Sequence, residues 1–197
     1  MDTSSYSQFL QAKETGRKAE ATSALNVFIS SFSSLQEREE WARDYLENEY
    51  SGHKVRHEIY QEIIFPVLVE GYRNSNAWCI KWLARTMQNL YQSKMLWEQV
   101  DGKTELQLLE LLYSLCPESD ETRMDLLQRK INWFRFSEHE WPAGILYGMH
   151  GASDEQCNKI LKEVAQAHRL DKEGHYLQYL NQFEEKVREY LKRLSEK

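Results

Sequence analysis

The scarcity of helix-breaking residues constrains this chain more than any other feature of its sequence. Its 197 residues include only three prolines and eight glycines. The segments between them are rich in Leu, Glu, Gln, Lys and Arg, which are good helix formers, and a strand is hard to place anywhere. We therefore predict an all-α fold, with helices at 18–32, 35–50, 55–73, 76–98, 105–116, 119–137, 154–169 and 172–194.

Capping signals and apolar spacing support these helices. Apolar residues recur three and four positions apart, so each helix has one stripe to bury. A hydroxyl residue followed three positions later by Glu or Gln indicates a capping box at three helix starts, which are Ser34 with Glu37, Thr104 with Gln107, and Ser153 with Gln156. Eight helices with short connections predict a single domain over 1–197, either an irregular bundle of helical hairpins or a short α-solenoid-like array. We expect the first 15 residues or so to pack loosely.

One predicted helix contains a proline. Pro66 interrupts the apolar sequence EIIFPVLVEGYR within the helix expected at 55–73. Proline removes one helical hydrogen bond and crowds the carbonyl one turn earlier. We therefore expect a kink at Pro66 or a division of the helix into two.

Composition limits the partners and the location of the protein. A formal net charge of −6 argues against nucleic-acid binding, because binding to phosphates usually needs a concentrated basic surface. The start of the chain lacks the pattern of a signal peptide, and nowhere do eighteen apolar residues run together. The three cysteines are far apart and odd in number, which favours free thiols over a disulfide framework. These features predict a cytoplasmic protein that spans no membrane.

Catalytic and cofactor motifs are missing from the sequence. It contains no G-x-S-x-G, no G-x-G-x-x-G and no G-x-x-x-x-G-K, and no Glu is followed by His three residues later. We predict no catalytic residues, no metal and no cofactor. His53 and His57 are four residues apart, but Lys54 and Arg56 beside them would oppose a bound cation. We interpret them as surface histidines; the alternative is a metal-assisted enzyme with a helical pocket.

The predicted helix 35–50 separates into an apolar and an acidic face. Leu35, Ala42 and Leu46 are expected at the centre of its buried stripe. On the opposite side four carboxylates, which we call the acidic ridge, are spaced by three, four and three residues: Glu37, Glu40, Asp44 and Glu47. Like charges at these spacings repel slightly, a cost that a merely solvated face could avoid. The ridge is therefore either a solubilising face or a binding surface for a basic partner.

The loop expected at 139–153 is apolar without helical spacing. It contains Trp141 and Tyr147 among several glycines. Such a loop either folds back as a lid over the core or presents an aromatic patch to a partner. We expect Trp141 in the core, where Trp141→Ala would cost about 3 to 5 kcal/mol, and Tyr147 in an interface.

The last predicted helix has a coiled-coil spacing. Its apolar residues alternate four and three positions apart, at Tyr176, Leu180, Phe183, Val187, Tyr190 and Leu194. This seam could pair two chains. A terminal helix docked on its own domain explains the spacing equally, so we favour a monomer over a dimer through this helix.

Two stretches, WLARTMQNLYQSK and HEWPAGILYGM, resemble small all-α bacterial immunity proteins of intercellular toxin systems. The resemblance covers roughly residues 55 to 165 and includes no catalytic motif. It implies a cytoplasmic inhibitor that binds one cognate toxin domain, which the acidic ridge suggests is a basic domain such as a nuclease. No binding residue carries over, because these proteins share no binding motif. The alternatives are a helical-hairpin adaptor for another cellular protein and the helical-pocket enzyme described above.

Overall fold

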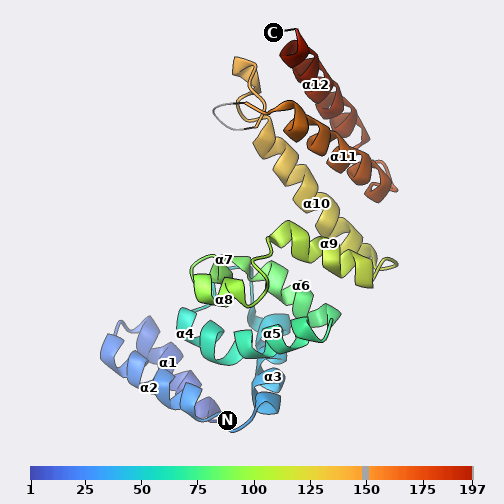
Figure 1. Ribbon diagram of the computed structural model, residues 1–197. Helices are drawn as coiled ribbons and strands as arrows, with labels where there is room; N and C mark the ends of the chain where they lie inside the picture. Colours follow the sequence, from blue (N-terminus) through green and yellow to red (C-terminus); the bar gives the residue numbers. More distant parts are fainter. Residues whose placement is uncertain (148–150, 197) are drawn as a thin grey trace. The chain divides into compact units, whose positions relative to one another are not determined.

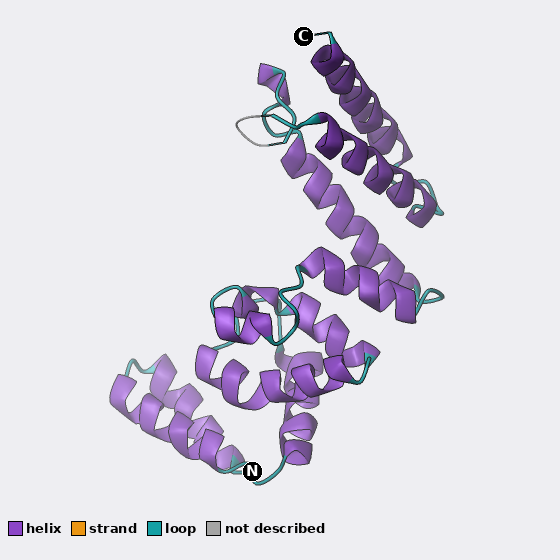
Figure 2. Cartoon of the chain, in the orientation of Figure 1, coloured by secondary structure: helices purple, strands orange, loops and turns teal. Residues whose placement is uncertain are grey.

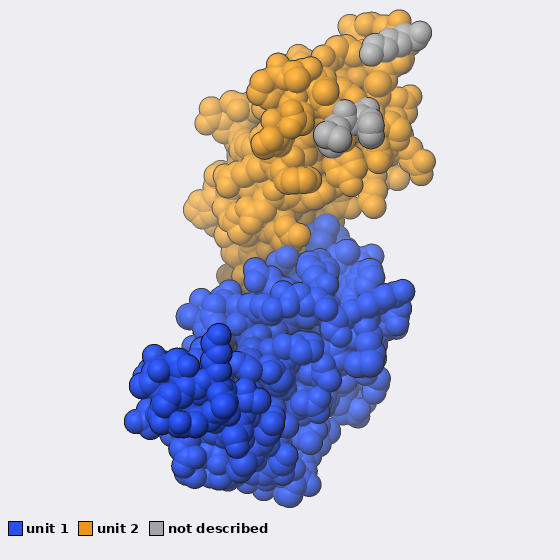
Figure 3. All heavy atoms as spheres, turned by 90° about the vertical axis from the view of Figure 1, so that its left-hand side faces the viewer, with its two compact units in different colours: residues 1–112 blue, residues 113–197 orange. Residues whose placement is uncertain are grey.

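The computed structural model describes residues 1–147 and 151–196, and all regular structure in these ranges is helical (Figures 1 and 2). The predicted all-α fold is therefore confirmed. Positions 148–150, which belong to the loop expected at 139–153, lie outside the described residues. None of the described helices is long and apolar enough to cross a membrane. The chain forms two compact units, Met1–Leu112 (unit 1) and Tyr113–Lys197 (unit 2) (Figure 3).

Unit 1 is built from short helices, two of them π-helical turns. Its elements are α1 (Thr3–Glu14), α2 (Lys18–Ser30), α3 (Leu35–Asp44), the π-helix η1 (Tyr45–Glu49), α4 (His57–Ile59), the π-helix η2 (Tyr60–Ile64), α5 (Phe65–Arg73), α6 (Ala77–Arg85), α7 (Met87–Leu90), α8 (Lys94–Glu98) and most of α9 (Glu105–Leu115).

The first residues of the chain form a helix that the sequence did not predict. The side chain of Asp2 caps α1 by accepting hydrogen bonds from the backbone N–H groups of Ser4 and Ser5 at 3.0 and 3.3 Å. α1 packs along α2 and buries Phe9. The expectation of a loosely packed N-terminus is thus corrected. The aromatic cluster that anchors this part of unit 1 consists of Tyr6, Phe28, Phe32, Trp41 and Tyr45.

The helix expected at 55–73 runs from His57 to Arg73 and is interrupted just before Pro66 by a π-helical segment. The turn η2 separates α4 from α5, and Pro66 is the second residue of α5. Because proline has no N–H for the helical ladder and crowds the preceding turn, a wider π turn just before it is a physically reasonable accommodation.

The helix expected at 76–98 is also divided, into α6, α7 and α8. Two buried polar contacts lie near the breaks. The hydroxyls of Thr86 and Tyr60 are 3.0 Å apart, and Thr86 also donates to the carbonyl of Trp82 at 2.6 Å. Asn89 donates to the carbonyl of Val55 at 2.7 Å and accepts its N–H at 3.2 Å. Asn89 thereby satisfies both backbone groups of a buried residue, as a neighbouring strand would.

α5 and α6 make a very close contact. A Cβ atom at Gly71 would lie 2.1 Å from the Sγ of Cys79 and 2.6 Å from its Cβ. Only glycine fits there without displacement of one helix. Burial raises the pKa of the Cys79 thiol to about 11, so this cysteine remains protonated near neutral pH. All three cysteines are free, as predicted.

Unit 2 contains three long helices and a short 3₁₀ turn. They are α10 (Asp120–Ser137), η3 (Trp141–Ala143), α11 (Asp154–Leu170) and α12 (Leu177–Ser195). The apolar seam of α12 packs within its own unit, since Leu180, Phe183 and Val187 are fully buried and Phe183 stacks on Phe134 of α10 at 4.9 Å. The centre of this seam is therefore already covered within one chain.

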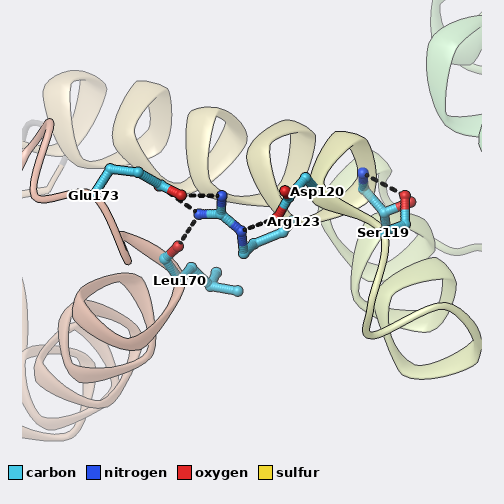
Figure 4. A network of polar contacts seen from close by, with 6 residues as sticks. Ser119, Asp120, Arg123, Leu170 and Glu173 are labelled. Atoms are coloured by element: carbon cyan, nitrogen blue, oxygen red, sulfur yellow. Dashed lines mark hydrogen bonds and ion pairs between the residues drawn. The ribbon is translucent and has the colours of Figure 1, made fainter.

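Two cations of α10 are buried, which the apolar spacing did not predict. The side chain of Arg123 is 3% exposed, and its guanidinium donates to both carboxylate oxygens of Glu173 at 2.7 and 3.0 Å. It also donates to the carbonyl of Leu170 at 2.5 Å and to Asp120 at 3.1 Å (Figure 4). Two helical turns after Arg123, the buried Lys130 forms an ion pair with Glu163 of α11. Polar contacts thus fix α11 against α10.

Candidate interaction surfaces

The acidic ridge lies on α3 and η1. Its first carboxylate, that of Glu37, already has partners within the chain. Glu37 accepts the N–H of Ser33 at 2.8 Å, and the N-terminal amine lies 3.7 Å away. The hydrogen bond from Ser33 is the main reason why the pKa of Glu37 is lowered. Leu35, expected in the buried stripe, is 44% exposed because it is the first residue of α3; Ala42 and Leu46 are buried as predicted.

The middle of the ridge is exposed and held by neutral side chains. Glu40 accepts a hydrogen bond from the amide of Gln36 at 3.2 Å, and Asp44 accepts one from Asn48 at 2.8 Å. Neither carboxylate has an ion-pair partner in the described part of the chain. The amides orient these two groups without neutralising them.

The last ridge residue is turned toward another helix. Since η1 is π-helical, the angular spacing of a regular α-helix is lost after Asp44. The indole N–H of Trp78 donates to Glu47 at 2.7 Å, and the guanidinium of Arg43 lies 4.1 Å from the centre of the Trp78 ring. The contact of Trp78 with Arg43 and Glu47 could not be predicted from the sequence, because no local pattern connects residue 78 with residues 43 and 47.

The loop after α10 lies partly in the core and partly along α12. Leu146 is fully buried, so the loop does cover part of the core of unit 2. Trp141 is only half-buried, which corrects the expectation of a core position. Its ring lies 5.1 Å from the guanidinium of Arg193 and 6.4 Å from the ring of Tyr190. Trp141 therefore packs on the flank of α12.

Tyr147 is the exposed aromatic residue of the same loop. Its side chain is 36% exposed, and its ring is edge-on to Trp133 at 6.2 Å. Its φ of 61° is in the left-handed region, and its N–H donates to the carbonyl of Ser137 at 2.8 Å. The ring is thus accessible, as an interface residue must be. The ridge belongs to unit 1, whereas Trp141 and Tyr147 belong to unit 2.

Similarity to known proteins adds no functional assignment. Comparisons with protein families, curated proteins and solved structures found no match for this chain.

We predict that Trp141→Ala lowers the free energy of unfolding by about 1 to 2 kcal/mol. The half-buried ring loses one aromatic contact and one cation–π contact, each worth about 1 kcal/mol. Urea denaturation measures the change, and Phe136→Ala, at an exposed position of α10, is the control and should stay within about 0.5 kcal/mol of wild type. A loss of about 4 kcal/mol or more, as for truncation of a core side chain, would contradict the half-buried position of Trp141.

The two histidines of the sequence motif do not share a helix face. His53 precedes α4, where its Nδ1 lies 2.8 Å from the hydroxyl of Ser51, and His57 is the first residue of α4. Among the described residues, no three His, Cys, Asp or Glu side chains form a group able to hold a metal ion.

We predict that the double variant His53→Ala/His57→Ala melts at the wild-type temperature and that the purified protein contains no stoichiometric zinc or iron. A structural metal would contribute several kcal/mol to folding, so its loss would be plain in the melting curve. Differential scanning calorimetry and elemental analysis measure the two quantities. Stoichiometric metal, lost together with the two imidazoles, would support the enzyme alternative.

Proposed function

We propose that this chain is an immunity-type inhibitor that binds a basic toxin domain through the acidic ridge. The observation that carries the proposal is the state of Glu40 and Asp44, which are exposed, oriented and without a cationic partner among the described residues. A merely solvated helix face gains from alternating charges, whereas an uncompensated anionic face attracts a basic partner.

The arrangement of the amides strengthens this argument. Gln36 and Asn48 are each four residues from the carboxylate that they contact, a position where lysine or arginine would form a surface ion pair. A neutral donor restricts the carboxylate rotamer but leaves the full negative charge. The ridge therefore presents fixed anionic groups, which can take the place of nucleic-acid phosphates in the groove of a nuclease-like domain.

Trp78 gives the ridge an adjacent anchor residue. Its half-buried ring is held between the carboxylate of Glu47 and the guanidinium of Arg43, which is itself paired with Glu39 at 2.9 Å. Trp and Arg dominate the binding energy of many interfaces when they are held rigidly and partly desolvated. This favours a compact partner surface centred on α3 over the solubilising interpretation.

Co-expression with a toxin tests the proposal. The partners to test are basic, nuclease-like domains encoded by neighbouring genes. The expected results for the cognate domain are restored growth of cells that express it and co-purification of the two proteins. Glu40→Gln/Asp44→Asn keeps both side-chain shapes and should weaken protection. Glu14→Gln/Glu185→Gln removes the same charge from exposed positions elsewhere and should protect like wild type. Equal protection by both double variants would exclude the ridge, and no protection by wild type would exclude the immunity function.

A further inference from the structure

A small pocket lies where the end of α10 meets the start of α11 in unit 2. It has a volume of about 130 Å³ and is lined by Trp133, Tyr147, Gln156, Lys159 and Ile160. A cavity of this size accommodates one benzene-sized group, as apolar cavities of about 150 Å³ do. The rings of Trp133 and Tyr147 meet edge-on at an interplanar angle of 69°, so two of its walls are aromatic.

The Tyr147 wall is held in an unfavourable backbone conformation. A bulky residue rarely adopts a φ of 61°, and such strain persists only where surrounding contacts enforce it. Here the contacts are the hydrogen bond from the Tyr147 N–H to Ser137 and the full burial of the preceding Leu146. Strain of this kind is concentrated at binding sites, where it presets the position of a side chain.

One charged side chain, that of Lys159, lines the pocket. On α11, Lys159 is exposed and has no partner among the described residues. The side-chain amide of Gln156 is neutral, and its oxygen accepts a hydrogen bond from the N–H of Ser153 at 2.8 Å, so Lys159 is the charged group of the lining.

We infer that this pocket binds one aromatic or branched apolar side chain of a partner protein, next to an aspartate or glutamate that pairs with Lys159. The volume and the aromatic walls select the apolar side chain. The unpaired ammonium selects the neighbouring carboxylate by charge complementarity. This site lies in unit 2 and takes an anionic segment, so it is independent of the basic partner proposed for the ridge.

Two small probes that differ by one charge test the inference. N-acetyl-L-phenylalanine supplies the ring and a carboxylate, and N-acetyl-L-phenylalaninamide supplies the ring alone. Titrated into the full-length ¹⁵N-labelled protein, both should shift the indole N–H signal of Trp133 and the amide signals of Tyr147 and Lys159. The acid should bind about threefold tighter than the amide, the fold-change expected of one exposed ion pair.

Matched variants assign the two parts of the pocket. Tyr147→Gly removes the aromatic wall and suits the left-handed backbone, so it should abolish the shifts at an undiminished melting temperature. Tyr91→Ala, at an exposed tyrosine of unit 1, should leave them unchanged. Lys159→Gln should reduce the affinity for the acid to that for the amide, whereas Lys172→Gln, at an exposed loop position, should not.

Three results would overturn the inference. The first is shifts distributed over both units, and the second is equal affinity for the two probes in wild type. The third is retention of binding by Tyr147→Gly. Concentration-dependent shifts of the same residues without any probe would identify a second copy of this chain as the occupant instead.

Discussion

Arg123→Ala lowers the free energy of unfolding by about 2 to 3 kcal/mol. The change removes a buried guanidinium that bonds both oxygens of Glu173, leaves the carbonyl of Leu170 without its donor and opens a cavity on α10. Loss of the donor to a buried carbonyl costs about 1 to 3 kcal/mol. Glu173 is 43% exposed, so water partly replaces its ion pair, which adds at most about 1 kcal/mol. Urea denaturation followed by circular dichroism measures the loss.

An exposed pair of the same residue types is the matched control for Arg123. Arg188 contacts Glu184 at 2.6 Å on the surface of α12, and Arg188→Ala should change stability by less than about 1 kcal/mol.

The contribution of Arg123 to the free energy of unfolding also has a defined pH dependence. Hydrogen bonds from Arg123 lower the pKa of Glu173 in the folded state, so the stabilisation is present above the unfolded pKa of about 4.3 and is lost as pH falls through the lower folded value. A penalty that does not shrink in acid would contradict the ion-pair assignment.

Gly71→Ala lowers the free energy of unfolding by about 3 kcal/mol. At an ordinary position in a helix this substitution stabilises by up to about 1 kcal/mol, so the expected sign is reversed. The added Cβ would overlap the side chain of Cys79 and push α5 from α6. Overpacking of this kind costs about 1 to 3 kcal/mol, with larger values at rigid contacts.

A double-mutant cycle isolates the contact between α5 and α6. Cys79→Ala removes the Sγ atom, which would be the nearest to the new methyl group. The double variant Gly71→Ala/Cys79→Ala should therefore lose at least about 1 kcal/mol less than the sum of the single losses. Additive losses would mean that the penalty of Gly71→Ala does not come from Cys79.

The helices with strong local signals could be predicted from sequence nearly to the residue. α9, α10 and α11 begin and end within one position of the predicted bounds, and the capping boxes at Thr104 and Ser153 are both formed. These signals depend only on residues a turn apart. α1 escaped prediction because its short, polar sequence carries few apolar residues, and its stability comes from packing on α2.

The breaks within unit 1 depend on contacts that no local pattern contains. Asn89 pairs with a backbone 34 residues earlier, and Tyr60 meets Thr86 across 26 residues. The same limit applies to the candidate surfaces. Sequence spacing placed Glu40 and Asp44 on an exposed face, but the turn of Glu47 toward Trp78 follows from a π-helix and a distant indole.

The rate of association between this protein and a basic toxin domain of the kind proposed as its partner, measured at two salt concentrations, tests the role of the ridge most directly. The variant carries Gln at Glu37, Glu40 and Glu47 and Asn at Asp44, which removes four charges and keeps the side-chain shapes. At low ionic strength it should associate at least about tenfold more slowly than wild type, because electrostatic steering raises association rates by roughly 10 to 1000 times. Added salt should slow the wild type and narrow this difference. Equal, salt-independent rates for the two proteins would show that the ridge only solvates its helix.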